Sequence, residues 1–128
     1  MLKTLKPTTV APPFSAYSHA VEIPAGARML YVSGQLGVAP DGSVPVDFEG
    51  QADQAFRNVI AILEAAGMAA SNLVRVNTYL TDSAHIGQYR AIRDRHLGGH
   101  EAASTMLVIS ALAQPHFLIE VEAIAVLD

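Results

Sequence analysis

The chain has 128 residues, of which 51% are hydrophobic and 16% are charged, and it carries a formal net charge of −4 and no cysteine. No basic cluster offers a phosphate-binding face, so we expect no nucleic-acid partner, and the missing thiols exclude disulfides, thiolate metal sites and cysteine nucleophiles. No apolar run reaches membrane-spanning length and the first residues lack a signal-peptide core, so we expect one cytoplasmic domain, residues 1–128, with no membrane contact.

Prolines dominate the start of the chain. Pro7, Pro12 and Pro13 predict an extended lead-in rather than a regular element. Two strand-like segments follow, at residues 20–23 and 29–33. The short turn-forming segment between them predicts that they form a β-hairpin.

The strongest helical periodicity runs from Phe48 to Ala66, where apolar residues recur at helical spacing. Gly67 stands at the position of a helix C-cap. Residues 73–81 then alternate between an apolar and a polar face, which predicts a strand.

A second helix is expected to begin near residues 81–83, which include N-capping side chains, and to stop at Gly98-Gly99. Residues 105–109 form an apolar run typical of a strand. His96 and His100 have the spacing of helical metal ligands, but the two glycines between them should end the helix, so we expect no metal there.

The last segment, residues 117–127, reads as a buried strand that contains two carboxylates. By alternation, Phe117, Ile119, Val121, Ala123, Ala125 and Leu127 form a wholly apolar face. Glu120 and Glu122 share the other face with Leu118, Ile124 and Val126. Ionised carboxylates are rarely buried without a partner, so these two are either paired structurally or used in chemistry.

The element order is therefore β-β-α-β-α-β-β, which predicts an α+β fold of one sheet with both helices on one face. The other sheet face carries apolar side chains that this chain does not cover. The hydrophobic fraction also exceeds what a domain of this size easily buries. Both observations predict that another subunit covers the open face.

Six segments in order resemble the RidA family, also called the YjgF/YER057c/UK114 family. They are residues 17–21 (YSHAV), 31–35 (YVSGQ), 54–58 (QAFRN), 63–67 (LEAAG), 78–82 (TYLTD) and 119–125 (IEVEAIA). The resemblance covers nearly the whole chain. It implies a chorismate-mutase-like fold assembled as a homotrimer, with small-molecule sites in the clefts between subunits.

Family members with known activity hydrolyse reactive imines or enamines to oxo acids and ammonia, without a cofactor. The resemblance implies that Glu120 holds the attacking water, that Tyr17 lines the cleft, and that Ser33-Gly34 contacts the ligand. Taken alone, Ser33-Gly34 could also be a plain transition from strand to loop. An imine carbon is electrophilic, so a carboxylate that orients water and moves its proton suits this reaction.

One position departs from the family pattern. Deaminating members carry an arginine at the start of the penultimate strand, where it binds the substrate carboxylate, and Ser104 occupies that position here. A hydrogen bond to a charged group contributes roughly 1.5–3 kcal/mol. Ordinary 2-imino acids are therefore doubtful substrates.

Arg90, on the predicted second helix, could supply a cation to the cleft from another direction. Alternatively it faces solvent with Arg93 and Arg95, as arginine usually does. The leading hypothesis is a trimeric imine or enamine deaminase with an atypical substrate range. The alternative is a non-catalytic trimer that binds a small molecule in the same cleft and acts as a sensor or regulator.

Overall fold

The computed structural model describes residues 2–128, and Met1 lies outside them. The strands and helices are β1 (Lys3–Leu5), β2 (Ala20–Glu22), β3 (Arg28–Leu36), α1 (Phe48–Ala65), β4 (Leu73–Leu80), α2 (Ile86–Leu97), β5 (Ala103–Val108) and β6 (Ile119–Leu127). Two short 3₁₀ turns, Ala70–Asn72 and Ser83–His85, precede β4 and α2.

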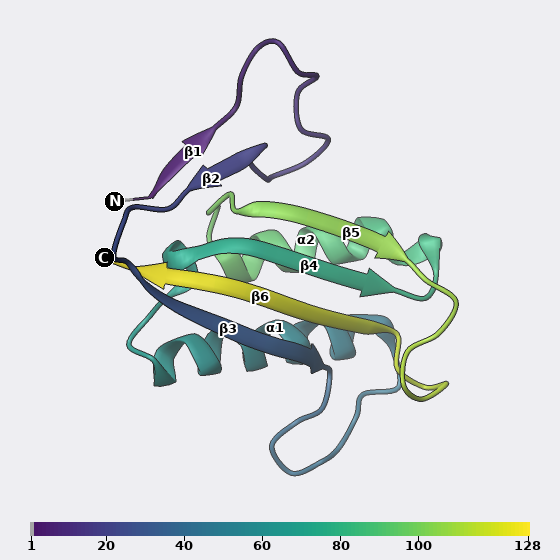
Figure 1. Ribbon diagram of the computed structural model, residues 1–128. Coiled ribbons are helices and arrows are strands. Elements are labelled where there is room, and N and C mark those ends of the chain that lie inside the picture. Colours follow the sequence, from purple (N-terminus) through teal and green to yellow (C-terminus); the bar gives the residue numbers. More distant parts are fainter. Residues whose placement is uncertain (1) are drawn as a thin grey trace.

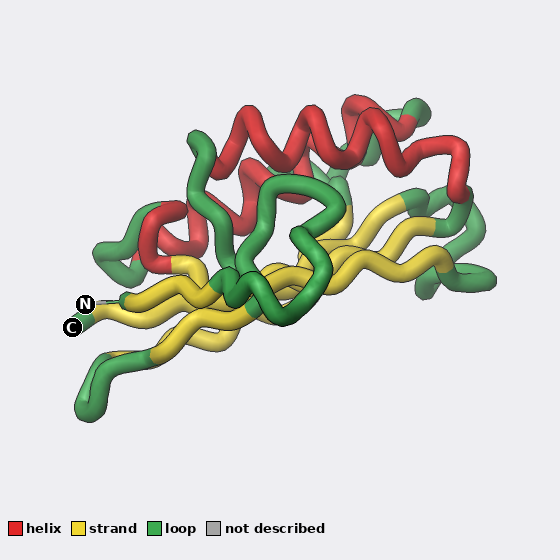
Figure 2. Tube along the Cα trace, turned by 90° about the horizontal axis from the view of Figure 1, so that it is seen from above, coloured by secondary structure: helices red, strands yellow, loops and turns green. Residues whose placement is uncertain are grey.

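The main sheet is mixed and has four strands in the order β3-β6-β4-β5. β4 and β5 are parallel and are joined through α2, whereas β6 is antiparallel to both of its neighbours. Both helices pack on the same face of this sheet, as Figure 2 shows. The α+β architecture predicted from the sequence is confirmed. Neither helix in residues 2–128 is long and apolar enough to cross a membrane.

The predicted hairpin of the first two strand segments is wrong, and so is the single sheet. β2 pairs with β1 in a separate two-stranded sheet, while β3 pairs with β6 (Figure 1). The turn signal between β2 and β3 correctly marked a reversal, but it could not specify which strands bond. β1 itself is three residues long and fully exposed, too short to show an alternation.

The core lies between the two helices and the main sheet, with α1 and β6 at its centre. Asp47 caps the helix by accepting a hydrogen bond from the N–H of Gly50, and Gly67 adopts positive φ just beyond its end. Four residues of the predicted apolar face are buried, namely Ile119, Val121, Ala123 and Ala125, whereas Phe117 and Leu127 are only partly buried. Val126, predicted on the open face, is buried as well. The register between β4 and β6 shifts near Leu73, so alternation fails there.

Gln51 joins the start of α1 to the loop that enters β6. Its amide nitrogen donates to the carbonyl oxygens of Pro45 and His116, and its amide oxygen accepts from the N–H of Leu118 at 2.8 Å. The side chain is only 1% exposed, so these bonds satisfy a buried polar group. They fix the direction in which β6 starts.

The sheet face opposite the helices is open and partly apolar. Tyr31 on β3 is 71% exposed and Leu107 on β5 is 48% exposed. Ile124 on β6 lies beside Tyr31 in the strand register. This is the uncovered face predicted from the sequence. Glu120, one of the candidate site residues, lies on the same face.

Candidate functional site

Glu120 and Gly34 lie against each other on β6 and β3. The register of these strands shifts between Val32 and Gln35, which leaves Ser33 and Gly34 in an irregular stretch of β3. A Cβ atom placed on Gly34 would lie 2.2 Å from Oε2 of Glu120. The carboxylate therefore occupies the space that any larger residue at position 34 would fill.

Glu120 and Glu122 differ in their partners although they share one strand face. Glu122 accepts hydrogen bonds from the Tyr79 hydroxyl at 2.6 Å and from Nδ2 of Asn77 at 3.2 Å. That bond to Glu122, together with burial and the negative charges of both glutamates, raises the pKa of Tyr79 above its ordinary value. Within residues 2–128, Glu120 accepts no hydrogen bond and forms no ion pair.

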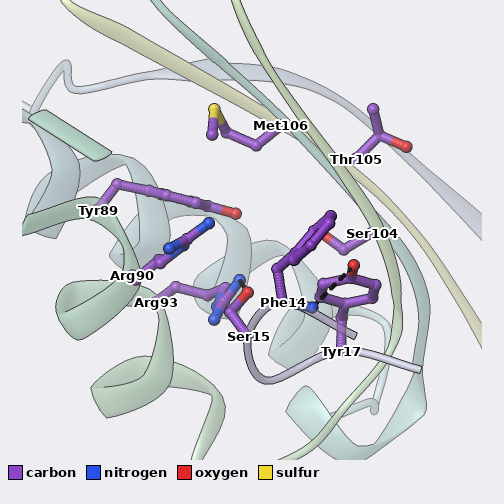
Figure 3. Close-up of a pocket in the computed structure, with 9 residues that line it drawn as sticks. All are labelled: Phe14, Ser15, Tyr17, Tyr89, Arg90, Arg93, Ser104, Thr105 and Met106. Carbon is purple, nitrogen blue, oxygen red and sulfur yellow. Dashed lines mark hydrogen bonds between the residues drawn. The ribbon is translucent and has the colours of Figure 1, made fainter. Parts of the chain in front are cut away.

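A pocket of about 240 Å³ lies between the N-terminal segment, α2 and β5 (Figure 3). Its lining includes Tyr17, Arg90 and Ser104. The N-terminal segment reaches this place because the N–H of Ser18 bonds to the Ala102 carbonyl, next to the start of β5. The backbone N–H of Phe14 donates to the Tyr17 hydroxyl at 3.2 Å. The structure thus brings together three of the predicted ligand-contacting residues.

Arg93 also lines this pocket, and the sequence interpretation missed it. The residue is 3% exposed, which contradicts the expectation that it faces solvent with Arg95. It lies four residues after Tyr89 and four before Leu97, both buried, so the helical spacing places it on the inner face of α2. This spacing from Tyr89 and Leu97 is the sequence signal that could have predicted the burial of Arg93. Arg90 is half-buried at the pocket, not directed wholly to solvent.

The candidate site residues form two groups that do not meet within one chain. The Glu120 group contains Glu120, Ser33 and Gly34, and the Tyr17 group contains Tyr17, Arg90 and Ser104. Ser104 sits on β5, the edge strand, and neighbours Met106 on the face that packs against the helices. Glu120 sits on β6, with β4 between them, and points to the open face together with its register partner Tyr79. The sheet separates the Glu120 group from the Tyr17 group.

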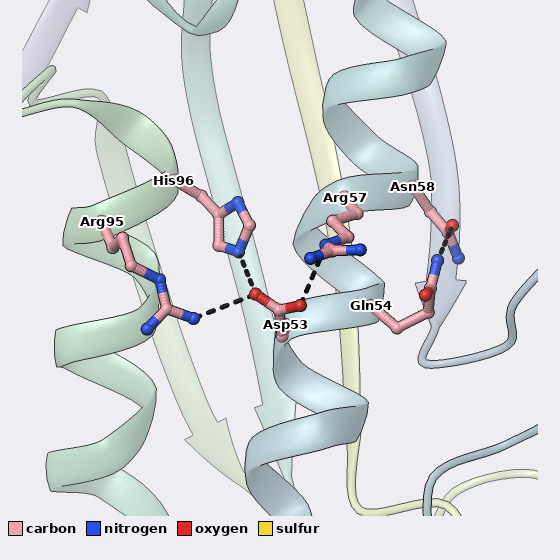
Figure 4. Close-up of polar contacts among 6 residues, drawn as sticks. All are labelled: Asp53, Gln54, Arg57, Asn58, Arg95 and His96. Carbon is pink, nitrogen blue, oxygen red and sulfur yellow. Dashed lines mark hydrogen bonds and ion pairs between the residues drawn. The ribbon is translucent and has the colours of Figure 1, made fainter.

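The two histidines considered as metal ligands have other partners. His96 bonds through Nε2 to Oδ1 of Asp53 at 2.8 Å, and His100 bonds through Nε2 to the Leu73 carbonyl. Asp53 also binds Arg57 and Arg95 (Figure 4). Across residues 2–128 no group of three metal-ligating side chains converges. Each histidine thus has a hydrogen-bond partner within the fold.

Comparison with known proteins shows the family. The family model described as Endoribonuclease L-PSP matches residues 8–127. The rat protein named 2-iminobutanoate/2-iminopropanoate deaminase is 36% identical over 113 residues, which cover 87% of this chain and 80% of the rat protein. The chain therefore belongs to the RidA/YjgF/L-PSP family.

Solved structures agree with this assignment. A Yersinia pestis protein, described as a member of unknown function of the conserved Rid protein family YyfB, superposes with a TM-score of 0.89 at 32% identity, covering 98% of both chains. E. coli TdcF with bound serine shares the fold at 24% identity, with a TM-score of 0.75 and coverage of 98% of this chain and 99% of TdcF. The α+β fold of this family is thereby confirmed.

Proposed function

We propose that this protein is a hydrolytic deaminase that converts reactive imines or enamines to an oxo compound and ammonia. The observation that carries the proposal is the Glu120 carboxylate, half-buried against Gly34 and without a partner in residues 2–128. A carboxylate in such a position is available to bind a water molecule. The activity named for the rat relative supports the same chemistry.

The reaction needs only the imine and water. Glu120 accepts a proton from the water as its oxygen bonds to the imine carbon, and the C=N double bond becomes a single bond in a carbinolamine. Glu120 returns this proton to the nitrogen, and the carbinolamine hydroxyl then gives its own proton, through Glu120, to the same nitrogen as the C–N bond breaks. Ammonia leaves, and the remaining oxygen forms the carbonyl group. Close placement of water and carbon provides much of the acceleration.

The cleft that binds the imine forms between subunits of a homotrimer in this proposal. Glu120, Ser33 and Gly34 of one subunit would face Tyr17, Ser104 and Arg90 of its neighbour. Support comes from the sheet, which separates the two groups within a chain, and from the exposed apolar side chains of the open face. The serine bound by TdcF supports a ligand of small size.

We test the proposal with 2-imino acids generated in situ by an amino-acid oxidase, whose disappearance is followed with and without the protein. Wild type should accelerate the loss, and Glu120→Gln should lower that acceleration by about 10²–10⁴-fold, the usual contribution of a positioned base. Glu122→Gln, the same change on the same strand face, is the matched control and should keep most of the activity. Equal activity of Glu120→Gln and wild type would contradict the assignment.

Ser104→Arg tests the substrate range. If wild type leaves the imino acids untouched and this variant accelerates their hydrolysis, deamination of ordinary imino acids is not the native function. In that case a neutral or hydroxylated imine, which a serine hydroxyl suits better, becomes the substrate to examine.

Ser104 also favours a second candidate, a trimer that binds a metabolite without converting it. Thermal unfolding in the presence of a ligand panel separates the two, because a binder is stabilised by a ligand that it returns unchanged. Stabilisation with full chemical recovery of the ligand would support the binding module. Stabilisation with release of ammonia would support the deaminase.

A further inference from the structure

Side chains of α1 hold both chain segments next to Glu120, the one that precedes it on β6 and the one opposite it at the end of β3. On β6, the Gln51 amide binds the carbonyl oxygen of His116 and the N–H of Leu118, each at 2.8 Å. These bonds end two residues before Glu120. They fix where β6 starts, but they do not fix how far β3 lies from it.

Asn58 of α1 holds the end of β3, opposite Glu120. Its Nδ2 atom donates hydrogen bonds to the carbonyl oxygens of Leu36 at 3.2 Å and Val38 at 2.9 Å. Leu36 is the register partner of Glu120. Gln54, one turn earlier on the helix, donates to Oδ1 of Asn58 at 2.8 Å (Figure 4), and this bond orients the amide with its NH₂ group toward the two carbonyls.

Gly37 lets the chain just beyond β3 lie directly against α1. A Cβ atom on this glycine would lie 2.5 Å from the carbonyl oxygen of Gln51 and 2.6 Å from its Cα atom. The backbone turns tightly here, because the N–H of Val38 donates to the Leu36 carbonyl at 2.8 Å. The same carbonyl accepts from Asn58. The helix and the strand end are therefore joined by direct backbone contact and by one short side chain.

The pairing of β3 with β6 is irregular beside Glu120. The register shifts between Val32 and Gln35, so regular strand pairing does not by itself fix this part of β3. The Glu120 carboxylate nevertheless lies against Gly34, within the irregular stretch. A contact from outside the sheet is needed to set the distance between Gly34 and Glu120.

We infer that Asn58 is a positioning residue for the Glu120 carboxylate. By holding the carbonyl oxygens of Leu36 and Val38 against α1, it fixes the end of β3 next to Gly34, and with it the space in which the carboxylate lies. Asn58 acts on Glu120 through the backbone of β3 and not through contact with a ligand. The inference goes beyond the proposed function and rests on it only where hydrolysis is the measurement.

The test replaces Asn58 by leucine, which is similar in size and forms no side-chain hydrogen bond. Asn58→Leu should lower kcat for imine hydrolysis by about 10- to 100-fold, the range expected when a reacting group is misplaced by up to an ångström, and should change KM by less than about twofold.

Asn72→Leu is the matched control. Asn72 is also half-buried, and its Nδ2 donates to the carbonyl oxygen of Val126 at 3.0 Å, near the end of β6 that lies away from Glu120. This variant loses the same kind of bond to a backbone carbonyl, so its thermal midpoint should fall in the same way as that of Asn58→Leu. Its kcat should stay at the wild-type value.

A spectroscopic measurement gives a result that does not depend on turnover. In NMR spectra, the ¹³C signal of the Glu120 carboxyl carbon should move in Asn58→Leu and stay in place in Asn72→Leu. Gln54→Leu guards against a variant that does not fold, because it removes only the bond that orients the Asn58 amide. It should move the same signal and lower kcat by about two- to tenfold, the loss expected for one neutral hydrogen bond.

The outcome is separable from that of the deaminase test. A Glu120 signal that moves in Asn58→Leu, in a protein that hydrolyses no imine, would remove the proposed activity and leave the positioning role. If wild type is active, equal kcat values of Asn58→Leu and Asn72→Leu would remove the positioning role and leave the activity. A Glu120 signal that stays in place in both α1 variants would also overturn the inference.

Discussion

Gly34 has no side chain, and this leaves the space that the Glu120 carboxylate occupies. The carboxylate oxygen lies 2.2 Å from where a Cβ atom would stand, closer than any real side chain permits. Gly34 is not among the glycines with positive φ, so its backbone conformation would accept alanine. Glycine is therefore needed at position 34 to leave room for the Glu120 side chain, and not to allow an unusual backbone conformation.

Gly34→Ala should therefore damage activity far more than stability. The group that must move is the flexible end of Glu120, so we expect a thermal midpoint close to that of wild type and imine hydrolysis lowered by about 10²-fold, as for misplacement by an ångström. Gly87→Ala on α2, where nothing lies within 4 Å, is the control and should be as active as wild type. Full activity of Gly34→Ala would show that the position of the carboxylate is not critical.

At the scale of elements, Asp53 links the outer surfaces of α1 and α2. It accepts from His96 and Arg95 on α2 and pairs with Arg57 one turn along α1 (Figure 4). Burial by itself would raise the pKa of Asp53, but the bonds from His96 and Arg95 and the charge of Arg57 outweigh burial and hold this pKa below its ordinary value. The ionised form is thus favoured in the folded protein.

This cluster predicts a pH dependence of stability. Because the folded pKa of Asp53 lies below the unfolded one, its contribution is complete above the unfolded value near 3.8 and is lost as the pH falls through the folded pKa. Asp53→Asn should lower the free energy of unfolding by about 1 kcal/mol at pH 7, and the difference from wild type should shrink below pH 3.8. Urea unfolding at pH values from 7 down to below 3.8 measures this difference in the free energy of unfolding. Glu64→Gln, at an exposed position, is the control. A difference that does not depend on pH would contradict the ionic origin.

At the scale of the whole molecule, the sheet has one face covered by helices and one face open (Figure 2). The Glu120 group belongs to the open face and the Tyr17 group to the helix side and the β5 edge. Under the proposed function, a complete cleft would need two copies of the chain. The homotrimer, the cytoplasmic location and the one-domain organisation stay predictions.

Tyr31→Asp should separate the subunits. The side chain is 71% exposed in one chain, so in an assembly that covers this face a carboxylate would be buried without a partner. Light scattering should fall from three times the 13.6 kDa chain mass toward the mass of one chain, and imine hydrolysis should fall with it. Ala61→Asp on the outer face of α1 should preserve both. A trimeric Tyr31→Asp would place the contact on another face.

The sequence by itself determined the elements whose signals are local. Apolar spacing and a glycine marked the limits of α1 to within a residue, and six short segments identified the family before any coordinates. Alternation along β6 also put both glutamates on one face, away from the core. Each of these follows from the period of a helix or strand, which a short stretch of chain already displays.

Only the tertiary structure decided which distant segments meet. β3 pairs with β6 and not with β2, Gly34 accommodates the Glu120 side chain, and Arg93 is buried beside Ser104 although arginine is usually exposed. These contacts join residues that lie far apart in the chain. Their energies depend on packing, burial and hydrogen bonding across the fold, which no local period encodes.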